Sequence, residues 1–341
     1  MMTAVILLLA VPVSCVKENA QEGRGARLVP EVAISGSHIV SGTRAAYSGT
    51  TFTKDKTLGL SICVHEEGMP AVFEPFLTGY GNIKATSTDD TGDSWTFYSN
   101  AIGVSLSELY LTSRQDRTRA DIYAYAPYMD GVSDITAIPV DFSQNQDVMY
   151  AVQNGVSNRD IDPEVNAEIP VPLTFRHLLC RLRFGFKLEY AGSNHLMDYI
   201  TIKKTGAGTT PLYSQGTFNA LTGSISAGQA DSVRVKFKGT NTSDHEHYGL
   251  FSNAGGYTYF DFLLYPTDFA ADGDLTVIFT IDDFRHEYVI RREDIKHSDG
   301  VTYGFQPGCS YDFQFQLDNY VHLKGITIQS SWTPDVLEDV L

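Results

Sequence analysis

The stretch PLTFRHLLCRLRFGFKL, residues 172–188, carries the clearest strand pattern of the chain. From residue 180 onward, apolar and cationic side chains alternate with a period of two, which predicts a β-strand with one buried face and one solvated face. The apolar positions are Cys180, Leu182, Phe184, Phe186 and Leu188, and the cationic ones are Arg181, Arg183 and Lys187. Because a slip of one residue would turn the cations inward, the pattern strongly specifies the register of this strand.

The residues just before this strand do not hold the same alternation. Residues 174–179 contain Phe175, His177 and two leucines, so we expect a bend or a turn that leads into the strand. His177 lies beside these leucines, which favours a structural histidine whose ring is hydrogen-bonded within the protein.

Length and composition limit the class of protein. The 341 residues are sufficient for two domains with a core each. Helical patterns are scarce, whereas 29 glycines and 13 prolines separate many short apolar runs rich in aromatic residues, which predicts an all-β protein of sandwich type. The net charge of −16 argues against a nucleic-acid partner and suits a soluble extracellular surface.

The first residues are typical of an export signal. Residues 1–14, MMTAVILLLAVPVS, form an apolar run that is too short to cross a bilayer as a stable helix, and polar residues follow it. Ser14 and Cys15 resemble a bacterial lipobox, in which the cysteine is lipid-modified and becomes the first residue of the mature protein. Lipidation of Cys15 would attach the protein to a membrane surface through the lipid alone. Secretion without a lipid, and a buried first strand, are the alternatives.

Three other cysteines, Cys63, Cys180 and Cys309, lie in apolar strand-like contexts. Their spacing lacks the close pairs of a metal site, so we expect buried small hydrophobic residues. A disulfide between Cys180 and Cys309 is an open alternative in an oxidising compartment.

A strand and a protease-sensitive segment are predicted before residue 50. Leu28, Val32 and Ile34 share one face of a strand, and Pro30 marks it as an edge strand. The following residues 41–46, SGTRAA, are small and contain Arg44 as their one basic residue. Such a segment is easily cut, because a protease needs extended and mobile backbone. An ordinary surface loop is the alternative.

The middle of the chain suggests further strands and a domain junction. Residues 120–129 alternate Ile122, Ala124 and Ala126 against two tyrosines, whereas residues 106–119, LSELYLTSRQDRTR, predict a short helix or an exposed loop. The polar stretch that ends near Asn166 is the predicted junction. We therefore expect an N-terminal β-sandwich domain over 45–166 and a C-terminal one over 167–341.

The last strands contain an interruption. Tyr311, Phe313, Phe315 and Leu317 alternate with polar residues. Ile326 and Ile328 are out of step with the apolar Val321 and Leu323, so a bulge or a break is predicted at Gly325.

Four stretches together resemble the fimbrillin family, the subunits of type V pili and related cell-surface lipoproteins. They are IYAYAP at 122–127, DVMYA at 147–151, LTFRHLLCRLRFGF at 173–186 and GITIQSSW at 325–332. The resemblance implies two tandem transthyretin-like β-sandwich domains after an export signal. It also implies an outer-membrane lipoprotein or an extracellular fimbrium of a Gram-negative bacterium.

The resemblance further implies a maturation step and an assembly step. An arginine-specific protease would remove the first strand with the propeptide 15–44, cutting between Arg44 and Ala45, with Arg24 and Arg27 as competing sites. The vacated groove would accept a donor strand from another pilin subunit, either a second copy or a neighbouring pilin. The candidate donor contains Ile326, Ile328 and Trp332; the alternative is that this segment is only the last strand of its own domain.

Enzymatic functions are disfavoured, because the chain lacks the common nucleophile, metalloprotease and phosphate-binding motifs. Residues 244–247, DHEH, and the acidic positions Asp160, Asp162 and Glu164 are interpreted as solvated loops, so no metal, cofactor or catalytic residue is predicted. A non-polymerising surface lipoprotein that binds a glycan or a host protein is the competing function, and it would need a fixed concave aromatic site. A glycan-active enzyme would need paired carboxylates across a cleft.

Overall fold

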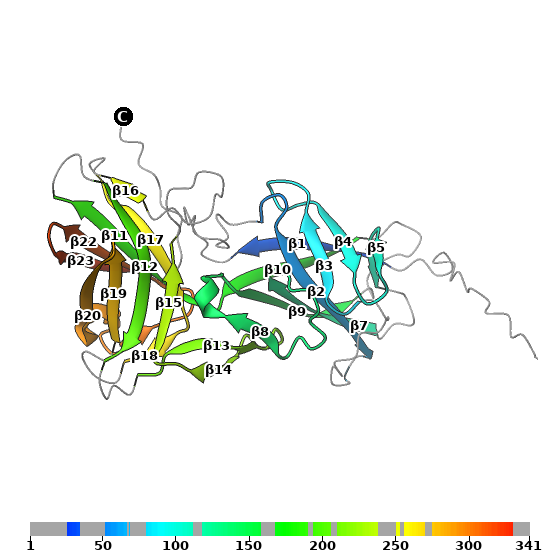
Figure 1. Cartoon of the computed structure of the whole chain (residues 1–341). Coiled ribbons are helices and arrows are strands. Elements are labelled where there is room, and N and C mark those ends of the chain that lie inside the picture. Colours follow the sequence, from blue (N-terminus) through cyan, green and yellow to red (C-terminus); the bar gives the residue numbers. More distant parts are fainter. Residues whose placement is uncertain are drawn as a thin grey trace, which may run out of the picture.

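The protein consists almost entirely of β-strands arranged in two lobes (Figure 1). The computed structural model describes residues 26–34, 52–66, 68, 80–111, 118–157, 168–189, 194–205, 210–237, 250–252, 256–269 and 275–329. The helical elements in these ranges are two short 3-10 turns, η1 (Phe142–Gln144) and η2 (Arg292–Ile295). The prediction of an all-β sandwich fold is confirmed.

The N-terminal lobe is built from one nine-stranded sheet in the order β5-β4-β3-β2-β7-β9-β10-β1-β6. Side chains from β2, β3 and β7 pack with side chains from β1 and β10 in a single hydrophobic core. The strands are β1 (Ala26–Ile34), β2 (Thr57–Glu66), β3 (Ile83–Ser87), β4 (Trp95–Ser99), β5 (Val104–Leu106), β6 (Leu109–Leu111), β7 (Thr118–Ala126), β9 (Met149–Ser157) and β10 (Glu168–His177).

Strand β10 corrects the prediction for residues 174–179. Its side chains alternate strictly between exposed and buried from Glu168 to His177, and the turn is confined to Leu178 and Leu179. Phe175 and His177 thus continue the buried row of β10, while Cys180 opens the next strand. The stretch 172–188 therefore spans two strands that belong to different sheets.

Strand β1 lies between β10 and β6. It runs parallel to β10 along the register from Arg27 to Ile34, while β6 pairs only with its first residues, Ala26 to Leu28. The side of Pro30 away from β10 therefore has no paired strand in the described residues, as expected for proline. The prediction of a helix or loop over 106–119 is wrong for β6, because Leu109 is buried in the core of this lobe.

The C-terminal lobe is a sandwich of two sheets. One has the order β17-β11-β22-β23 and the other β15-β12-β19-β20, with β16 paired to β12. The strands are β11 (Cys180–Leu188), β12 (Asn194–Lys204), β15 (Ser232–Lys236), β16 (Leu250–Ser252), β17 (Thr258–Leu264), β19 (Leu275–Ile281), β20 (Phe284–Ile290), β22 (Ser310–Leu317) and β23 (Val321–Gln329), and a short pair is formed by β18 (Thr267–Asp268) and β21 (Gly304–Phe305).

Aromatic rings fill the interior of this sandwich. Phe184 on β11 lies edge-on to Phe279 of the opposite sheet at 5.2 Å between centroids, and it also contacts Phe313 on the neighbouring strand. The predicted irregularity near Gly325 is confirmed as a β-bulge, because Gly325 pairs with Gln314 whereas Leu323 pairs with Phe315. The bulge lets apolar residues on both sides of it face the same core.

A third sheet connects the lobes. Strand β8 (Ile138–Asp141), from the first half of the chain, pairs with β13 (Tyr213–Phe218), which also pairs with β14 (Ile225–Gln229). These three strands lie in the region between the two lobes (Figure 1). They cover the second face of β7, so that Tyr123 and Tyr125 are buried there with Phe218 and Ile138.

The strands on either side of the junction predicted near residue 166 belong to the same sheet. Strands β9 and β10, on either side of residues 158–167, are paired with each other in the N-terminal sheet. The chain passes to the C-terminal sandwich at Leu178 and Leu179, immediately before β11. Both leucines are buried.

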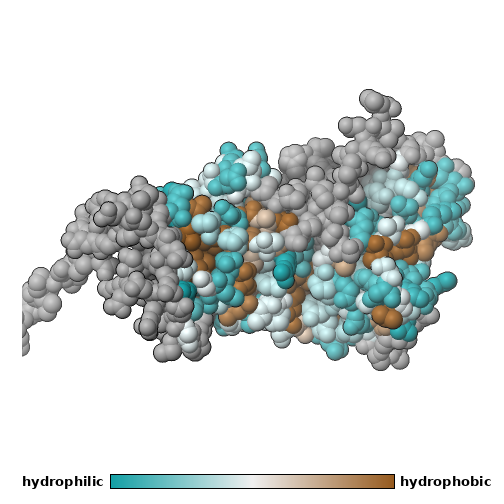
Figure 2. All heavy atoms as spheres, turned by 180° about the vertical axis from the view of Figure 1, so that it is seen from behind, coloured by the Kyte–Doolittle hydropathy of each residue, from teal (hydrophilic) through white to brown (hydrophobic). Residues whose placement is uncertain are grey.

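Apolar residues do not form one continuous area on the face seen in Figure 2. They appear there as separate patches on both lobes, with hydrophilic residues between them. The most exposed large hydrophobic side chains in the described part of the chain include Phe284 and Val301, at 72% and 77% exposure. No helix in the described segments is long and apolar enough to cross a membrane.

Two phenylalanines allow a matched test of the C-terminal core. Phe184 is fully buried, whereas Phe284 is 72% exposed. We expect Phe184→Ala to lower the free energy of unfolding by about 3–5 kcal/mol, because it leaves a cavity among packed rings. Phe284→Ala should change it by less than about 0.5 kcal/mol. Urea unfolding followed by circular dichroism measures both, and equal effects of the two changes would contradict this core.

Candidate functional site at the terminal strands and the lobe junction

Strand β1 supplies part of the core of the N-terminal lobe. Leu28 and Ile34 are 2% and 3% exposed, and Val32 packs against the same core while half-buried. Backbone hydrogen bonding extends to β10 over the whole strand. Removal of β1 would therefore uncover apolar side chains and a row of unpaired backbone groups on β10 at once.

The predicted processing residues are only partly within the described structure. Arg24, Arg44 and Ala45 lie outside the described residues, as does Cys15. Arg27 lies in β1, where its guanidinium Nη1 is 3.2 Å from Glu108 Oε1 and 3.0 Å from Glu168 Oε1. Because its backbone pairs with strands on both sides, Arg27 is poorly suited to proteolysis while β1 is in place.

The predicted donor residues Ile326 and Ile328 lie in β23, and Trp332 lies outside the described residues. β23 is the edge strand of its sheet, and it is hydrogen-bonded to β22 from Val321 to Gln329. Ile326 and Ile328 are half-buried and pack against the C-terminal core. These two residues are thus engaged in their own lobe.

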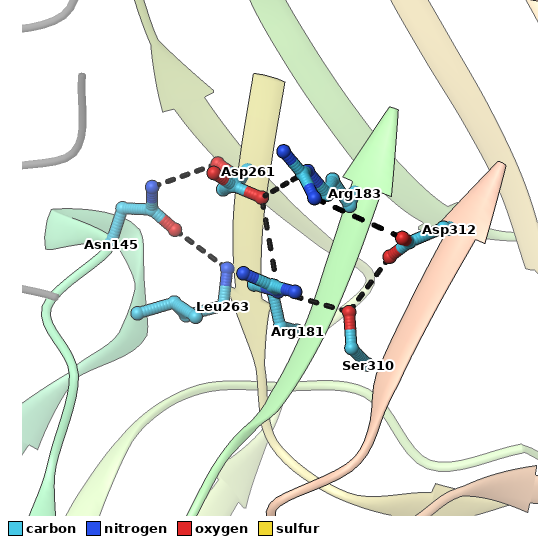
Figure 3. A network of polar contacts seen from close by, with 7 residues as sticks. All are labelled: Asn145, Arg181, Arg183, Asp261, Leu263, Ser310 and Asp312. Atoms are coloured by element: carbon cyan, nitrogen blue, oxygen red, sulfur yellow. Dashed lines mark hydrogen bonds and ion pairs between the residues drawn. The ribbon is translucent and has the colours of Figure 1, made fainter. Parts of the chain in front are cut away.

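The expectation that Arg181 and Arg183 lie on a solvated face is wrong. Arg181 is fully buried and Arg183 largely so, whereas Lys187 is exposed as expected. Leu263, which pairs with Arg181 on the neighbouring strand, packs in one cluster with Phe142 and Val148, and the local pattern could not indicate this packing. The two guanidinium groups lie in a polar network with Asp261 on β17 and Asp312 on β22 (Figure 3).

Two carboxylates balance the two cations in this network. Asp261 Oδ1 lies 4.0 Å from Arg181 Nε and 3.9 Å from Arg183 Nε, and Asp312 Oδ2 lies 3.9 Å from Arg183 Nη1. Arg181 Nε donates a hydrogen bond of 2.9 Å to Ser310 Oγ, which in turn donates one of 2.8 Å to Asp312 Oδ1. Formal neutrality of the group makes burial of the guanidinium groups tolerable.

Tyr259 and Gly185 help to hold the Arg183 side chain in place. The guanidinium carbon lies 4.0 Å from the centroid of the Tyr259 ring, a cation–π contact. Tyr259 pairs with Gly185 across the strands, and a Cβ atom at Gly185 would approach Tyr259 Cε1 to 2.5 Å. Only glycine therefore lets this ring lie across β11 beneath the arginine.

Asn145 joins the N-terminal lobe to the edge of β17 (Figure 3). Its Oδ1 accepts a 2.6 Å hydrogen bond from the Leu263 backbone N–H, and its Nδ2 donates one of 3.0 Å to the Asp261 carbonyl. Asn145 is fully buried and has a φ of 53°, a conformation that asparagine adopts more readily than most residues. One side-chain amide thus takes the place of a neighbouring strand on the β17 edge.

The prediction for His177 is confirmed. His177 Nδ1 lies 2.9 Å from Asp147 Oδ2, and both side chains are buried. The contact joins the end of β10 to the segment that follows Asn145, and it has a structural role. Within the described ranges, no group of three or more His, Cys, Asp or Glu residues is arranged to hold a metal ion. Asp160, Asp162, Glu164 and residues 244–247 lie outside those ranges.

The prediction of buried cysteines is also confirmed. Cys63, Cys180 and Cys309 are buried thiols that form no disulfide with one another. Burial, followed by the charge of Asp121, raises the pKa of the Cys63 thiol to about 11, and burial raises that of Cys180 well above its ordinary value. Such thiols are poor nucleophiles at neutral pH.

Sequence reasoning missed Asn145, Asp261 and Asp312. Two of them carried a signal, because Asp261 and Asp312 each interrupt an apolar strand, TYFDFLL and SYDFQFQL. An acidic residue inside a buried strand calls for a buried cation, and the arginines of β11 are the complement. Asn145 lies in a polar turn and carried no such signal.

Comparisons with known proteins agree with this architecture. The family model described as fimbrillin-like matches residues 43–334. The fold is similar to that of a proposed cell adhesion protein from Bacteroides ovatus, with a TM-score of 0.58 and 15% identity over 90% of this chain and 98% of that one. A second such protein, from Bacteroides uniformis, gives a TM-score of 0.56 and 16% identity over 92% and 99%. No curated protein matches this chain.

The role of the Asn145 amide at the edge of β17 can be tested by two substitutions that both remove the amide and differ in backbone freedom. We expect Asn145→Ala to lower the free energy of unfolding by about 2–4 kcal/mol, because two buried backbone groups lose their partner. Asn145→Gly keeps the left-handed conformation and should be milder by about 1 kcal/mol. Urea denaturation gives both values; an Asn145→Ala protein as stable as the wild type would show that the amide does not hold the β17 edge.

The charge balance of the network can be tested by a double-mutant cycle. Asp261→Asn should cost about 3–5 kcal/mol, because it leaves two buried arginines with one carboxylate. Combination with Arg181→Met, which removes one cation and keeps similar volume, should recover part of that loss. The unfolding free energies of the two single variants and of the double variant give the coupling energy between Asp261 and Arg181. Strictly additive losses would mean that the two residues are not coupled.

Proposed function

The chain belongs to the fimbrillin-like family, and we propose that it is a structural subunit of type V fimbriae that supports cell adhesion. In this proposal the subunit polymerises by donor-strand exchange, after an arginine-specific protease has removed its first strand by cutting between Arg44 and Ala45. Its partners in the fibre are other pilin subunits. We further propose that Cys15 carries the lipid that anchors the precursor at the outer membrane.

The position of β1 is the observation that carries this proposal. It is the first described strand, it precedes Arg44 in the sequence, and it fills a slot between β10 and β6. Cutting after Arg44 leaves β1 attached to the rest only by non-covalent contacts. Loss of β1 would then open a slot lined by the core of the lobe and by the backbone of β10, which an extended segment of another subunit can fill.

The sequence of residues 330–341, which follow β23 and are called the tail below, supports the proposal that they are the segment that fills the slot. In β1, Leu28, Pro30, Glu31 and Val32 follow the pattern apolar-x-Pro-acidic-Val, and Trp332, Pro334, Asp335 and Val336 repeat it. Residues 330–341 outnumber the nine residues of β1. We infer that the tail enters the slot in the register of β1, with Trp332 in the place of Leu28 and Val336 in that of Val32.

The described strands fit this use of the tail. Ile326 and Ile328 belong to the predicted donor, and we propose that they stay in β23 and hold its base against the C-terminal core. The opposite edge of the same sheet, β17, is occupied by the Asn145 amide. A growing fibre would therefore extend from the β23 side of this lobe.

A second function is favoured by a concave aromatic pocket at Tyr213 and Tyr265. A surface protein that binds a glycan or a host protein without polymerising would use such a site. The two functions can be tested separately, because none of the residues that line the pocket belongs to β1 or β23.

The strand-exchange proposal is tested with purified full-length protein and an arginine-specific protease. We expect treated wild-type protein to form fibres that resist dissociation in detergent at room temperature, and Arg44→Ala to remain monomeric. Trp332→Ala should be cut normally yet assemble at least ten-fold less, because it loses the largest apolar group of the donor. Electron microscopy and denaturing gels without heating report assembly.

The matched control is Tyr320→Ala, which removes an aromatic side chain that is 70% exposed on the turn before β23. This variant should assemble like the wild type. Fibre formation by uncleaved Arg44→Ala, or normal assembly of Trp332→Ala, would contradict the proposal. Intact mass of protein extracted from the cell surface reports lipidation at Cys15 and the processing point independently of assembly.

A further inference from the structure

The pocket beside β18 and β21 is formed by three separate segments. It has a volume of about 290 Å³, near the lower end of small-molecule sites. Its lining comprises Pro211, Tyr213, Tyr265, Pro266, Thr267, Asp268, Phe305 and Gln306. It thus combines aromatic side chains with one carboxylate and one amide.

The aromatic wall of the pocket is fixed in place. The rings of Tyr213 and Tyr265 meet edge-on, 4.4 Å apart between centroids and at an angle of 64°. Tyr265 also contacts Phe142 of η1, at 5.8 Å between centroids. Both tyrosines are half-buried, so each ring presents part of its surface to the pocket while the rest is packed. Two rings held nearly perpendicular form a rigid corner.

The polar wall is held equally firmly. Asp268 Oδ1 accepts a 3.0 Å hydrogen bond from Gln306 Nε2. The backbone N–H of Gln306 donates to the Tyr311 hydroxyl at 2.8 Å, and Thr267 Oγ1 donates to the Pro211 carbonyl at 2.9 Å. Asp268 is exposed, which leaves its second carboxylate oxygen accessible to a ligand. The site therefore needs little ordering on binding.

The tyrosine hydroxyls add further polar groups. Tyr213 and Tyr265 both line the pocket, and a phenol hydroxyl can donate and accept hydrogen bonds. Burial, with a smaller contribution from Tyr213, raises the pKa of the Tyr265 phenol. That hydroxyl is protonated at neutral pH and can donate a hydrogen bond.

We propose that this pocket binds a neutral saccharide, one sugar ring of which stacks against the Tyr213–Tyr265 corner while its hydroxyls bond Asp268 and Gln306. The C–H groups on one face of a pyranose are weakly positive and suit the negative face of an aromatic ring. Neighbouring hydroxyl groups of a sugar can donate to a carboxylate and accept from an amide. Asp268, the lack of a cation in the lining and the net charge of −16 disfavour an anionic sugar.

A peptide is the less suitable occupant. An extended peptide gains most of its affinity from a free strand edge or from a long apolar groove. The lining here is compact, and β18 and β21 are paired with each other through Thr267 and Asp268. A site of this size accommodates about one ring and its substituents.

The test uses the full chain, with binding measured by saturation-transfer difference NMR and by titration. The probes are lactose, mannobiose and diacetylchitobiose, with 3′-sialyllactose as the anionic counterpart of lactose. We expect at least one neutral probe to bind with a Kd of about 0.1–5 mM, corresponding to a single-ring contact. Sialyllactose should bind at least ten-fold more weakly than lactose if lactose is that probe.

Variants locate the site. Asp268→Asn and Tyr213→Leu should each weaken binding at least ten-fold, and Tyr265→Phe, which keeps the packing of the ring, should weaken it two- to five-fold. Asp283→Asn and Tyr320→Leu alter exposed side chains elsewhere and should leave the Kd unchanged. Circular dichroism confirms that each variant is folded.

Three results would overturn the proposal. One is the absence of any saturation transfer from the neutral probes at about 10 mM, where a site of millimolar Kd is largely filled. Another is binding that Asp268→Asn and Tyr265→Phe both leave unaltered. The third is a lysine- or arginine-containing peptide that binds the wild type more tightly than every sugar and loses affinity in Asp268→Asn. None of these results depends on whether the subunit polymerises.

Discussion

Burial of two guanidinium groups at the lobe junction constrains the rest of this structure. A charged group taken out of water is costly unless an opposite charge and hydrogen-bond partners accompany it. Arg181 and Arg183 meet this condition only because β17 and β22 each place an aspartate beside β11. The three strands must therefore stay in their mutual register.

The contacts between the lobes are directional as well as apolar. Asn145 bonds two backbone groups of β17, and β8 pairs with β13 across the junction. Each of these bonds fixes the orientation of the strands that it joins, so a rotation of one lobe relative to the other would break them. In a fibre, the β1 slot of the N-terminal lobe and the β23 edge of the C-terminal lobe would then keep a constant separation, so that each added subunit takes the same orientation.

The sequence predicted the inward-facing half of this structure well and the outward-facing half poorly. Alternation identified Leu182, Phe184 and Phe186 as core residues. The burial of a side chain that faces the interior of its own sandwich can be predicted from the alternation within its strand. The burial of Arg181 and of Tyr125 depends on strands far along the chain that cover the second face, which no local window contains. For the same reason no local pattern indicated that the chain passes to the other lobe at the buried Leu178 and Leu179. The sites at Arg44 and Trp332 rest on family resemblance and on the repeated Pro-acidic-Val pattern.

In the proposed assembly, the cost of exchanging β1 would make a protease a suitable trigger. While β1 is part of the chain, its tether gives it a high effective concentration at the slot, and a segment from another molecule cannot compete. A cut at Arg44 would abolish that advantage without changing any contact of β1. A donor that buries a tryptophan where β1 buries Leu28 would then gain apolar area at the same backbone pairing. In the proposed mechanism, strand exchange would thus be downhill only after cleavage, which would keep the precursor monomeric and would make assembly directional once it begins.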